Sequence, residues 1–314
     1  MNRSARLPSV QWPHGKRFAF TVFDDPDGQT LRHGRIVYDF LADLGFRTTK
    51  GVWPLSGPRP SDDGQTCDEP AYRDWVQCLR HRGFEIGFHN ATFDTSDREQ
   101  TARGLERFAS LFGGYPRAMA NHYACRESVY WRADRLTGLR RWTYQTLAPW
   151  RMSWAASGHV PGHPNFWGDL CKAHIQYVRN FVYSDVNTLR ACPLMPYHDP
   201  LRPYVNYWFA SSDGANVKRF TARLSEENQD RLEAEGGACI MYAHFGHGFA
   251  ENGKLNPRFR QLMERLHKRG GWFVPVSELL DHLLSQRTSP VITDEQRADL
   301  EWRWLLCKIV SGSS

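Results

Sequence analysis

The chain has 314 residues, of which 41% are hydrophobic and 13% aromatic, and its formal net charge is +6. This length suffices for one large α/β domain or two smaller ones with a sizeable core. The mild positive charge suits an anionic ligand or a membrane surface. The sequence contains no long Lys/Arg block and no nucleic-acid motif, so we do not expect a nucleic-acid partner.

Seven cysteines are scattered along the chain, and none forms a Cys-x-x-Cys pair. An odd, dispersed set is typical of reduced thiols rather than of a disulfide framework or a zinc–thiolate site. Residues 1–15 contain no apolar core typical of a secretory signal, and no apolar run reaches the roughly 18 residues of a membrane span. We therefore expect a cytoplasmic protein without a transmembrane segment.

The first clear signal is the apolar, β-branched run 18–23, which is followed directly by Asp24 and Asp25. The run predicts a short buried strand that ends at two carboxylates. In α/β folds, ligands bind outside the carboxyl ends of the strands. A divalent metal on one Asp would leave the other free as a base, whereas the sequence Asp-Asp-Pro-Asp-Gly would also suit a plain turn.

Helices and strands then alternate, which predicts parallel strands joined by helical crossovers. In chain order the predicted elements are helix 31–45, strand 46–53, helix 71–83, strand 85–89, helix 98–112 and strand 118–122. Three of the strand ends carry residues of metal-ligand or hydrogen-bonding type: Asp24-Asp25, His89 and Asn121-His122. This repetition favours a functional site at one end of the sheet.

Residues 131–200 are rich in Trp, Arg, Pro and Tyr and have little periodicity. Between positions 131 and 151, Asp134 is the one acidic residue among five arginines, which are Arg132, Arg135, Arg140, Arg141 and Arg151. We interpret residues 131–235 as an elaboration over the mouth of a barrel that shapes a substrate groove. The alternative is a solvated Arg-rich surface whose Trp side chains cap the core.

In the last third of the chain, helices and strands alternate again. Its predicted elements are helix 225–236, strand 238–243, helix 256–269, strand 272–276, helix 278–284 and a terminal helix 294–309. The strand 238–243 ends at His244. We expect one barrel domain over residues 16–284 and a C-terminal helical extension, 290–314, that packs on it.

The order of these motifs resembles the polysaccharide deacetylase family, which includes the nodulation-type chitooligosaccharide deacetylases. The Thr-x-Asp-Asp motif is similar to residues 21–25 here, with one extra residue before the Asp pair. The Gly-x-Glu-Ile-Gly-x-His motif is similar to residues 83–89, the Leu-His strand end to residues 241–244, and the closing strand and helix to residues 271–280. The resemblance covers residues 16–130 and 236–284 and implies a distorted (β/α) barrel, here with an inserted aromatic and Arg-rich segment and an extra C-terminal helix.

The resemblance also implies a hydrolase of linear amide C–N bonds that uses one divalent metal ion, with Zn²⁺ first and Co²⁺, Ni²⁺ or Mn²⁺ as alternatives. By family role, Asp24 is the general base, Asp25 and His89 bind the metal, and His244 protonates the leaving amine. The implied substrate is an N-acylated amino sugar, with acetyl as the first choice of acyl group. We expect it to be a nucleotide- or lipid-linked precursor of bacterial surface polysaccharide.

Two positions depart from the family pattern. The second histidine of the family's His-x-x-x-His motif is Phe93 here, which cannot bind a metal. His122 is the preferred replacement ligand, because a strand-end imidazole suits these metals, and Asp94 is the alternative. The third motif's arginine, which orients the base, is also absent, and Arg117 or Arg126 are the candidates for its role.

Three further residues are expected at the substrate. Tyr207 and Trp208 resemble the family's aromatic wall, although they would also suit a core, and Asn121 lies next to the preferred ligand. Two other functions remain open: a non-catalytic carbohydrate-binding protein on the same fold, or a hydrolase of another linear amide or formamide. The oligomeric state is left open.

Overall fold

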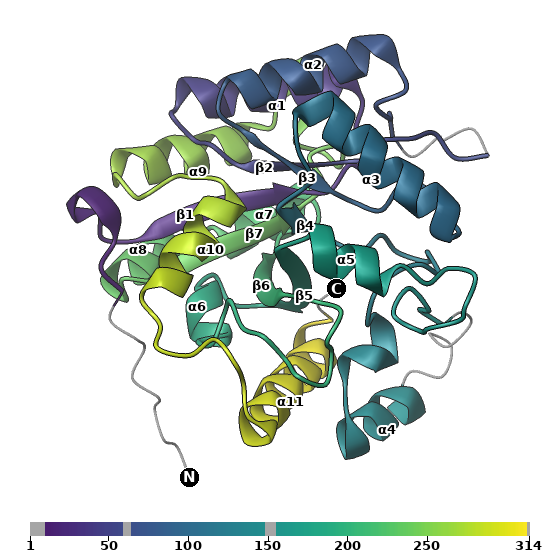
Figure 1. The fold of residues 1–314 in the computed structure, drawn as a ribbon. Helices are drawn as coiled ribbons and strands as arrows, with labels where there is room; N and C mark the ends of the chain where they lie inside the picture. The colour runs from purple at the N-terminus through teal and green to yellow at the C-terminus, as the bar shows by residue number, and fades with distance from the viewer. Residues whose placement is uncertain (1–9, 59–63, 148–154, 313–314) are drawn as a thin grey trace.

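Within the described residues, which are 10–58, 64–147 and 155–312 of the computed structural model, seven parallel strands close into a barrel surrounded by helices (Figure 1). Each strand pairs with the next in chain order, and β7 pairs with β1 to close the ring. The strands are β1 (Ala19–Asp24), β2 (Thr49–Val52), β3 (Glu85–Phe88), β4 (Ala118–Met119), β5 (Tyr177–Tyr183), β6 (Tyr207–Asp213) and β7 (Ala238–Ala243). The predicted (β/α) barrel is confirmed.

Helices surround the barrel (Figure 1). They are α1 (Leu31–Asp43), α2 (Pro70–His81), α3 (Arg98–Phe112), α4 (Gly138–Leu147), α5 (Gly168–His174), α6 (Thr188–Ala191), α7 (Val217–Arg223), α8 (Glu226–Ala234), α9 (Pro257–Lys268), α10 (Val276–Ser285) and α11 (Asp294–Ser311). Short 3-10 helices, η1 (Pro13–Gly15) and η2 (Arg132–Arg135), and a two-stranded sheet of β8 (Ala250–Glu251) and β9 (Lys254–Leu255) complete the described elements. None of these helices is long and apolar enough to cross a membrane.

The barrel interior is filled by aromatic rings. Phe23 of β1 is fully buried, and its ring lies 6.3 Å from that of Phe209 on β6. A Cβ at Gly51 would approach the Phe23 ring to 3.2 Å, and one at Gly87 to 2.9 Å. These two glycines on neighbouring strands therefore leave the room that the large ring needs, and the closed barrel depends on this small–large pairing.

The prediction for residues 131–235 needs a correction, because this range contributes two barrel strands, β5 and β6, and not an elaboration alone. Strand β5 has the sequence Tyr-Val-Arg-Asn-Phe-Val-Tyr, and Arg179 and Asn180 interrupt its apolar run although both are buried. The polar pair concealed the strand in the sequence. Arg151 lies outside the described residues.

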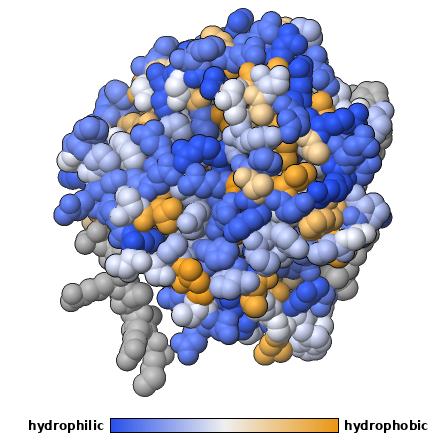
Figure 2. All heavy atoms as spheres, viewed as in Figure 1, coloured by the Kyte–Doolittle hydropathy of each residue, from blue (hydrophilic) through white to orange (hydrophobic). Residues whose placement is uncertain are grey.

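The predicted strand 272–276 is also corrected, since the structure has only an isolated bridge between Trp272 and Ala19. Pro275 lacks the N–H that a strand ladder needs, and it caps α10 instead. The terminal helix α11 packs against β5 and α4, with Leu300, Trp304 and Leu305 buried. Figure 2 shows a mostly hydrophilic face with small, scattered hydrophobic areas.

Candidate active site and metal centre

A cavity of about 470 Å³ lies where the carboxyl ends of the barrel strands meet. Its lining includes Asp25 and Asp27 after β1, His89 after β3, His122 after β4 and His244 after β7. The parallel strands explain this convergence, because all of their carboxyl ends open on the same side of the barrel. The structure thus brings the three predicted histidines into one cavity, together with an aspartate, Asp27, that the sequence analysis did not select.

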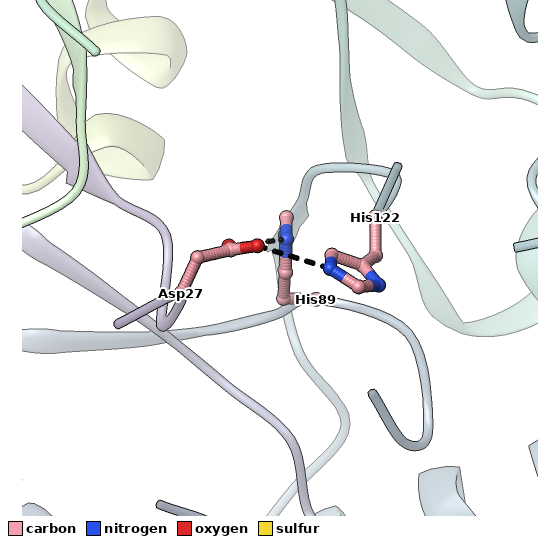
Figure 3. A group of neighbouring side chains, drawn as sticks. All are labelled: Asp27, His89 and His122. Atoms are coloured by element: carbon pink, nitrogen blue, oxygen red, sulfur yellow. Dashed lines mark hydrogen bonds and ion pairs between the residues drawn. The ribbon is translucent and has the colours of Figure 1, made fainter. Parts of the chain in front are cut away.

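Asp27, His89 and His122 form one tight cluster (Figure 3). His122 Nε2 lies 3.0 Å from Asp27 Oδ1, and His89 Nε2 lies 3.3 Å from Asp27 Oδ2. Both imidazoles are buried, and their ring centroids are 5.2 Å apart. The carboxylate therefore faces two imidazole nitrogens at once.

Neighbouring side chains fix the ring of His122. Its Nδ1 lies 3.2 Å from the Cys125 sulfur, which in turn donates to the Phe93 carbonyl oxygen at 3.5 Å. The rings of Phe93 and Trp53 lie 5.4 and 5.3 Å from the His122 ring. Phe93 stands where the family pattern has a ligand, and its ring thus supports the imidazole of His122 beside Asp27. Because His122 donates its Nδ1–H to the sulfur, its Nε2 faces the cluster.

The charges in this cluster depend on one another. Burial is the largest single influence on Asp27 and would raise its pKa, but the hydrogen bonds and charge interactions with His122 and His89 together lower that pKa well below its ordinary value. Burial lowers the pKa of His89 despite the nearby Asp25 and Asp27. For His122, burial is the largest single influence and would lower the pKa, but the hydrogen bond and charge of Asp27, together with the charges of Asp25 and Glu127, raise it. Asp27 is therefore an anion that the two imidazoles stabilise.

These residues fit a divalent metal ion. Two imidazoles and one carboxylate are the donor types that Zn²⁺, Co²⁺ and Ni²⁺ accept, and the three donor atoms lie within 4.8 Å of one another. Asp27 Oδ2 is buried, and although His89 Nε2 lies 3.3 Å away, no described residue donates to it with good hydrogen-bond geometry. A buried carboxylate oxygen without a well-aligned donor is costly, and a cation would satisfy it.

Asp25 is held by an arginine from another strand. Arg179 of β5 donates from Nη1 to Oδ1 at 2.9 Å and from Nη2 to Oδ2 at 2.5 Å, and both side chains are buried. The guanidinium also lies over the Tyr242 ring, 4.4 Å from its centroid. An arginine that orients an aspartate was expected at Arg117 or Arg126. Arg179 has this position in the structure. Arg117 instead pairs with Asp281.

His244 faces both aspartates. Its Nδ1 lies 2.8 Å from the Ala215 carbonyl oxygen, and its Nε2 lies 3.6 Å from Asp27 and 4.0 Å from Asp25. Because a carbonyl only accepts, Nδ1 carries the hydrogen in this bond and Nε2 faces the cavity. Asp25, Asp27 and His244 form a second group whose donor atoms lie close enough for a shared cation.

Asp24, predicted as the general base, does not line this cavity. It is fully buried, where it accepts hydrogen bonds from Gln29, Tyr38 and the Phe245 backbone N–H and lies 3.5 Å from Lys50. Burial raises the pKa of Asp24 and lowers that of Lys50, although each opposes the shift of the other. Adjacent strand residues point to opposite faces, so Asp24 and Asp25 have separate environments.

Of the three predicted substrate residues, one lines the cavity and two do not. Asn121 lines the cavity, and its amide also bonds both the N–H and the carbonyl of Val129. Tyr207 and Trp208 do not line it, because they begin β6 at the opposite end of the barrel, and Trp208 is buried. Asp94 belongs to neither group of potential metal ligands found in the described chain.

Sequence reasoning missed Asp27 and Arg179, although each left a signal. The extra residue between Thr21 and the aspartates shifts the alternation, so that Asp25 and Asp27 stand two apart on the same side. A charged residue within the apolar run of β5 was the signal for Arg179, since a buried arginine needs an acidic partner.

The fold is similar to those of several solved structures at low sequence identity. A protein assigned as a polysaccharide deacetylase from Mycobacterium smegmatis is 12% identical, with a TM-score of 0.53, over 91% of this chain and 96% of its own. Puue allantoinase is 12% identical, with a TM-score of 0.53, over 89% and 94%. A protein assigned likewise as a polysaccharide deacetylase from Pseudomonas aeruginosa PAO1 is 11% identical, with a TM-score of 0.52, over 89% and 95%.

No protein-family model and no curated protein matches the sequence. At sequence identities near 12%, the structural similarity shows the fold alone. The chain has the barrel fold found in polysaccharide deacetylases and in Puue allantoinase.

Proposed function

We propose that this chain is a metal-dependent hydrolase that removes an acyl group, acetyl in the simplest case, from the amide nitrogen of an amino sugar. One observation carries the proposal. A carboxylate–His–His donor set, an arginine-held carboxylate and a cavity-facing imidazole line the same cavity. This combination suits amide hydrolysis, because water must be activated and the leaving nitrogen must be protonated.

In this proposal Asp27, His89 and His122 hold one divalent cation, with Zn²⁺ as the first candidate. A bound cation would polarise the acyl carbonyl and lower the pKa of a water molecule beside it. Asp27 thereby replaces Asp25 in the ligand set that the resemblance implied. Asp94 is no longer a candidate ligand, since it lies outside both donor groups.

Asp25 is the proposed general base. It takes a proton from the attacking water, and Arg179 holds its carboxylate in one orientation through two parallel hydrogen bonds. Bidentate pairing leaves lone pairs on both carboxylate oxygens for that proton. The role moves from Asp24 to Asp25 because Asp24 is enclosed by its own donors.

His244 is the proposed general acid. The Ala215 carbonyl holds its Nδ1–H, so Nε2 is the atom that carries a proton toward the cavity. When the amide C–N bond breaks, Nε2 gives this proton to the departing nitrogen, and a free amine and a carboxylate result. The position of Nε2 in the cavity, 4.0 Å from Asp25 and 3.6 Å from Asp27, supports the assignment.

The proposed substrate is a precursor of bacterial surface polysaccharide, carried on a nucleotide or a lipid, and the proposed location is the cytoplasm. The structural neighbours assigned as polysaccharide deacetylases and the basic net charge support a carbohydrate with a phosphorylated carrier.

The test is acetate release from N-acetylglucosamine, from its oligosaccharides and from UDP-N-acetylglucosamine, with protein purified without chelator and supplied with Zn²⁺, Co²⁺, Ni²⁺ or Mn²⁺. Asp25→Asn is the inactive control. Metal-dependent release that this variant abolishes would support the proposal. Binding of these sugars without release under any metal would favour the carbohydrate-binding alternative, and release from a formamide panel alone would move the reaction to another amide.

A further inference from the structure

Part of the cavity wall is built by η2 and α11, outside the proposed catalytic centre. These elements contribute Trp131, Arg132, Arg135, Trp304 and Lys308 to the lining. The other described arginines of the Arg-rich segment behave differently, since Arg140 pairs with Glu301 and Arg141 pairs with Asp134. Arg132 and Arg135 of this segment therefore line the cavity, whereas Arg140 and Arg141 do not.

Arg135 is the distinctive member of this wall. It is only 4% exposed, and its guanidinium carbon lies 3.3 Å from the centroid of Trp131 and 5.5 Å from that of Trp304. No hydrogen bond or ion pair to Arg135 is present in the described parts of the chain, and its Nε is buried without a partner. The indole rings occupy its flat faces and leave its N–H edge to bind something else.

No carboxylate of the described residues forms an ion pair with Arg135. Burial, followed by repulsion from Arg179, lowers its pKa to about 9, and no carboxylate is among the main influences on it. Arg179 is itself occupied by Asp25, and Arg219 of the lining is occupied by Asp213. The lining as a whole carries five Lys or Arg side chains against two Asp.

The backbone that presents Arg135 is strained. Tyr130 and Arg132 have φ angles of 46° and 57°, which side-chain-bearing residues rarely adopt. Strain of this kind is retained at ligand-binding segments more often than elsewhere. The strained turn leads directly into η2, so it sets the position of Arg135 in the cavity wall.

We propose that Arg135 binds an anionic group of the substrate, a phosphate or a carboxylate, through the N–H edge of its guanidinium, with Arg132 and Lys308 adding positive charge. Planar, bidentate donation suits both anions, and a buried site strengthens it. The inference rests on the proposed function for the identity of the reaction, but not for the presence of the anion subsite.

The first experiment measures binding of inorganic phosphate to chelator-treated protein by calorimetry, so that a metal ion cannot bind the anion. Wild type, Arg135→Gln, Arg135→Lys and Arg260→Gln are compared. Arg260 is an exposed residue of α9 outside the cavity and serves as the matched loss of one charge. We expect phosphate to bind wild type and Arg260→Gln, about tenfold to a hundredfold more weakly to Arg135→Gln, and with intermediate affinity to Arg135→Lys.

The second experiment compares kcat/KM for N-acetylglucosamine, N-acetylglucosamine 1-phosphate and N-acetylmuramic acid, with metal supplied. Preference for the phosphate ester or for the carboxylate identifies the source of the anion, and Arg135→Gln should lose that preference. Equal rates on all three sugars, with phosphate binding unaffected by Arg135→Gln, would overturn the subsite and leave the proposed reaction standing. Phosphate binding that depends on Arg135, without hydrolysis of any sugar, would keep the subsite and overturn the reaction. If Arg135→Gln fails to fold, as judged by circular dichroism, Arg135→Lys carries the comparison.

Discussion

Arg179 on β5 and Asp25 after β1 are joined by two parallel hydrogen bonds of 2.9 and 2.5 Å, although 153 residues separate them in the sequence. Both side chains are buried. The neighbouring Asp24, which is adjacent in sequence, takes no part in this pair and is held by Gln29 and Tyr38. Two adjacent carboxylates therefore have different partners, and we expect different consequences when each is changed.

Replacement of Arg179 by Lys should lower kcat about a hundredfold or more, because an ammonium group cannot reproduce the two-bond geometry that orients Asp25. Metal content should stay at the wild-type value, since Arg179 is not a proposed ligand. Kinetics and elemental analysis of the same preparation check both points. Arg117→Lys, at the surface pair with Asp281, is the control and should keep wild-type kcat.

Substitutions of Asp24 and of Asp25 should have different effects on turnover and stability. Asp25→Asn should lose turnover by several orders of magnitude and keep the fold, because the amide cannot accept the proton from water. Asp24→Asn should keep turnover per folded molecule and lose about 3–5 kcal/mol of stability, since it leaves the buried Lys50 without its carboxylate. Urea denaturation and kcat measure the two effects, and a loss of turnover in fully folded Asp24→Asn would return the base to Asp24.

We expect the buried Glu127 to make the stability of the protein depend on pH. It is fully buried, where it accepts hydrogen bonds from Asn90 and from the Ser96 N–H, and burial raises its pKa from 4.5 to about 7. Between these values the folded chain keeps a proton that the unfolded chain has lost, so this group lowers stability as pH rises. The total change is about 3 kcal/mol between pH 4 and pH 8.

Glu127→Gln removes this titration. The free energy of unfolding of wild type minus that of the variant should therefore fall by about 3 kcal/mol from pH 4 to pH 8 in chelator-treated protein. Urea denaturation at both pH values measures it. A difference that does not change with pH would mean that Glu127 ionises in the folded protein as it does in the unfolded chain.

Much of the fold could be predicted because the outer helices and most barrel strands follow simple periodicities. Helix α3 begins and ends as predicted, since Asp97 caps its first turn and Gly113 ends it in the left-handed conformation. Strand β7 is an unbroken apolar run. Strand β5 could not be recognised in this way, because two polar residues stand side by side in its apolar run: Arg179 binds Asp25, and Asn180 donates to the Tyr197 hydroxyl.

The residue types of the site could be predicted from the sequence, but not which aspartate has which role. His89, His122 and His244 reach the cavity because each follows a strand of one parallel barrel. Which aspartate faces them depends on the side-chain alternation at the end of β1, and a one-residue insertion reverses it. The burial of Arg135 between two indoles depends on contacts between η2 and the distant α11, which local sequence patterns do not encode.

The central claim is that Asp27, His89 and His122 hold a divalent metal ion, and metal content tests it most directly. Wild type, Asp27→Ala, His122→Ala and Asp94→Ala are purified without chelator, incubated with Zn²⁺, desalted and analysed for bound metal, with folding checked by circular dichroism. We expect about one ion per chain in wild type and in Asp94→Ala, and a loss of most of it in the other two variants. Folded Asp27→Ala or His122→Ala with wild-type metal content, or a wild type that takes up no Zn²⁺, Co²⁺, Ni²⁺ or Mn²⁺, would contradict this account.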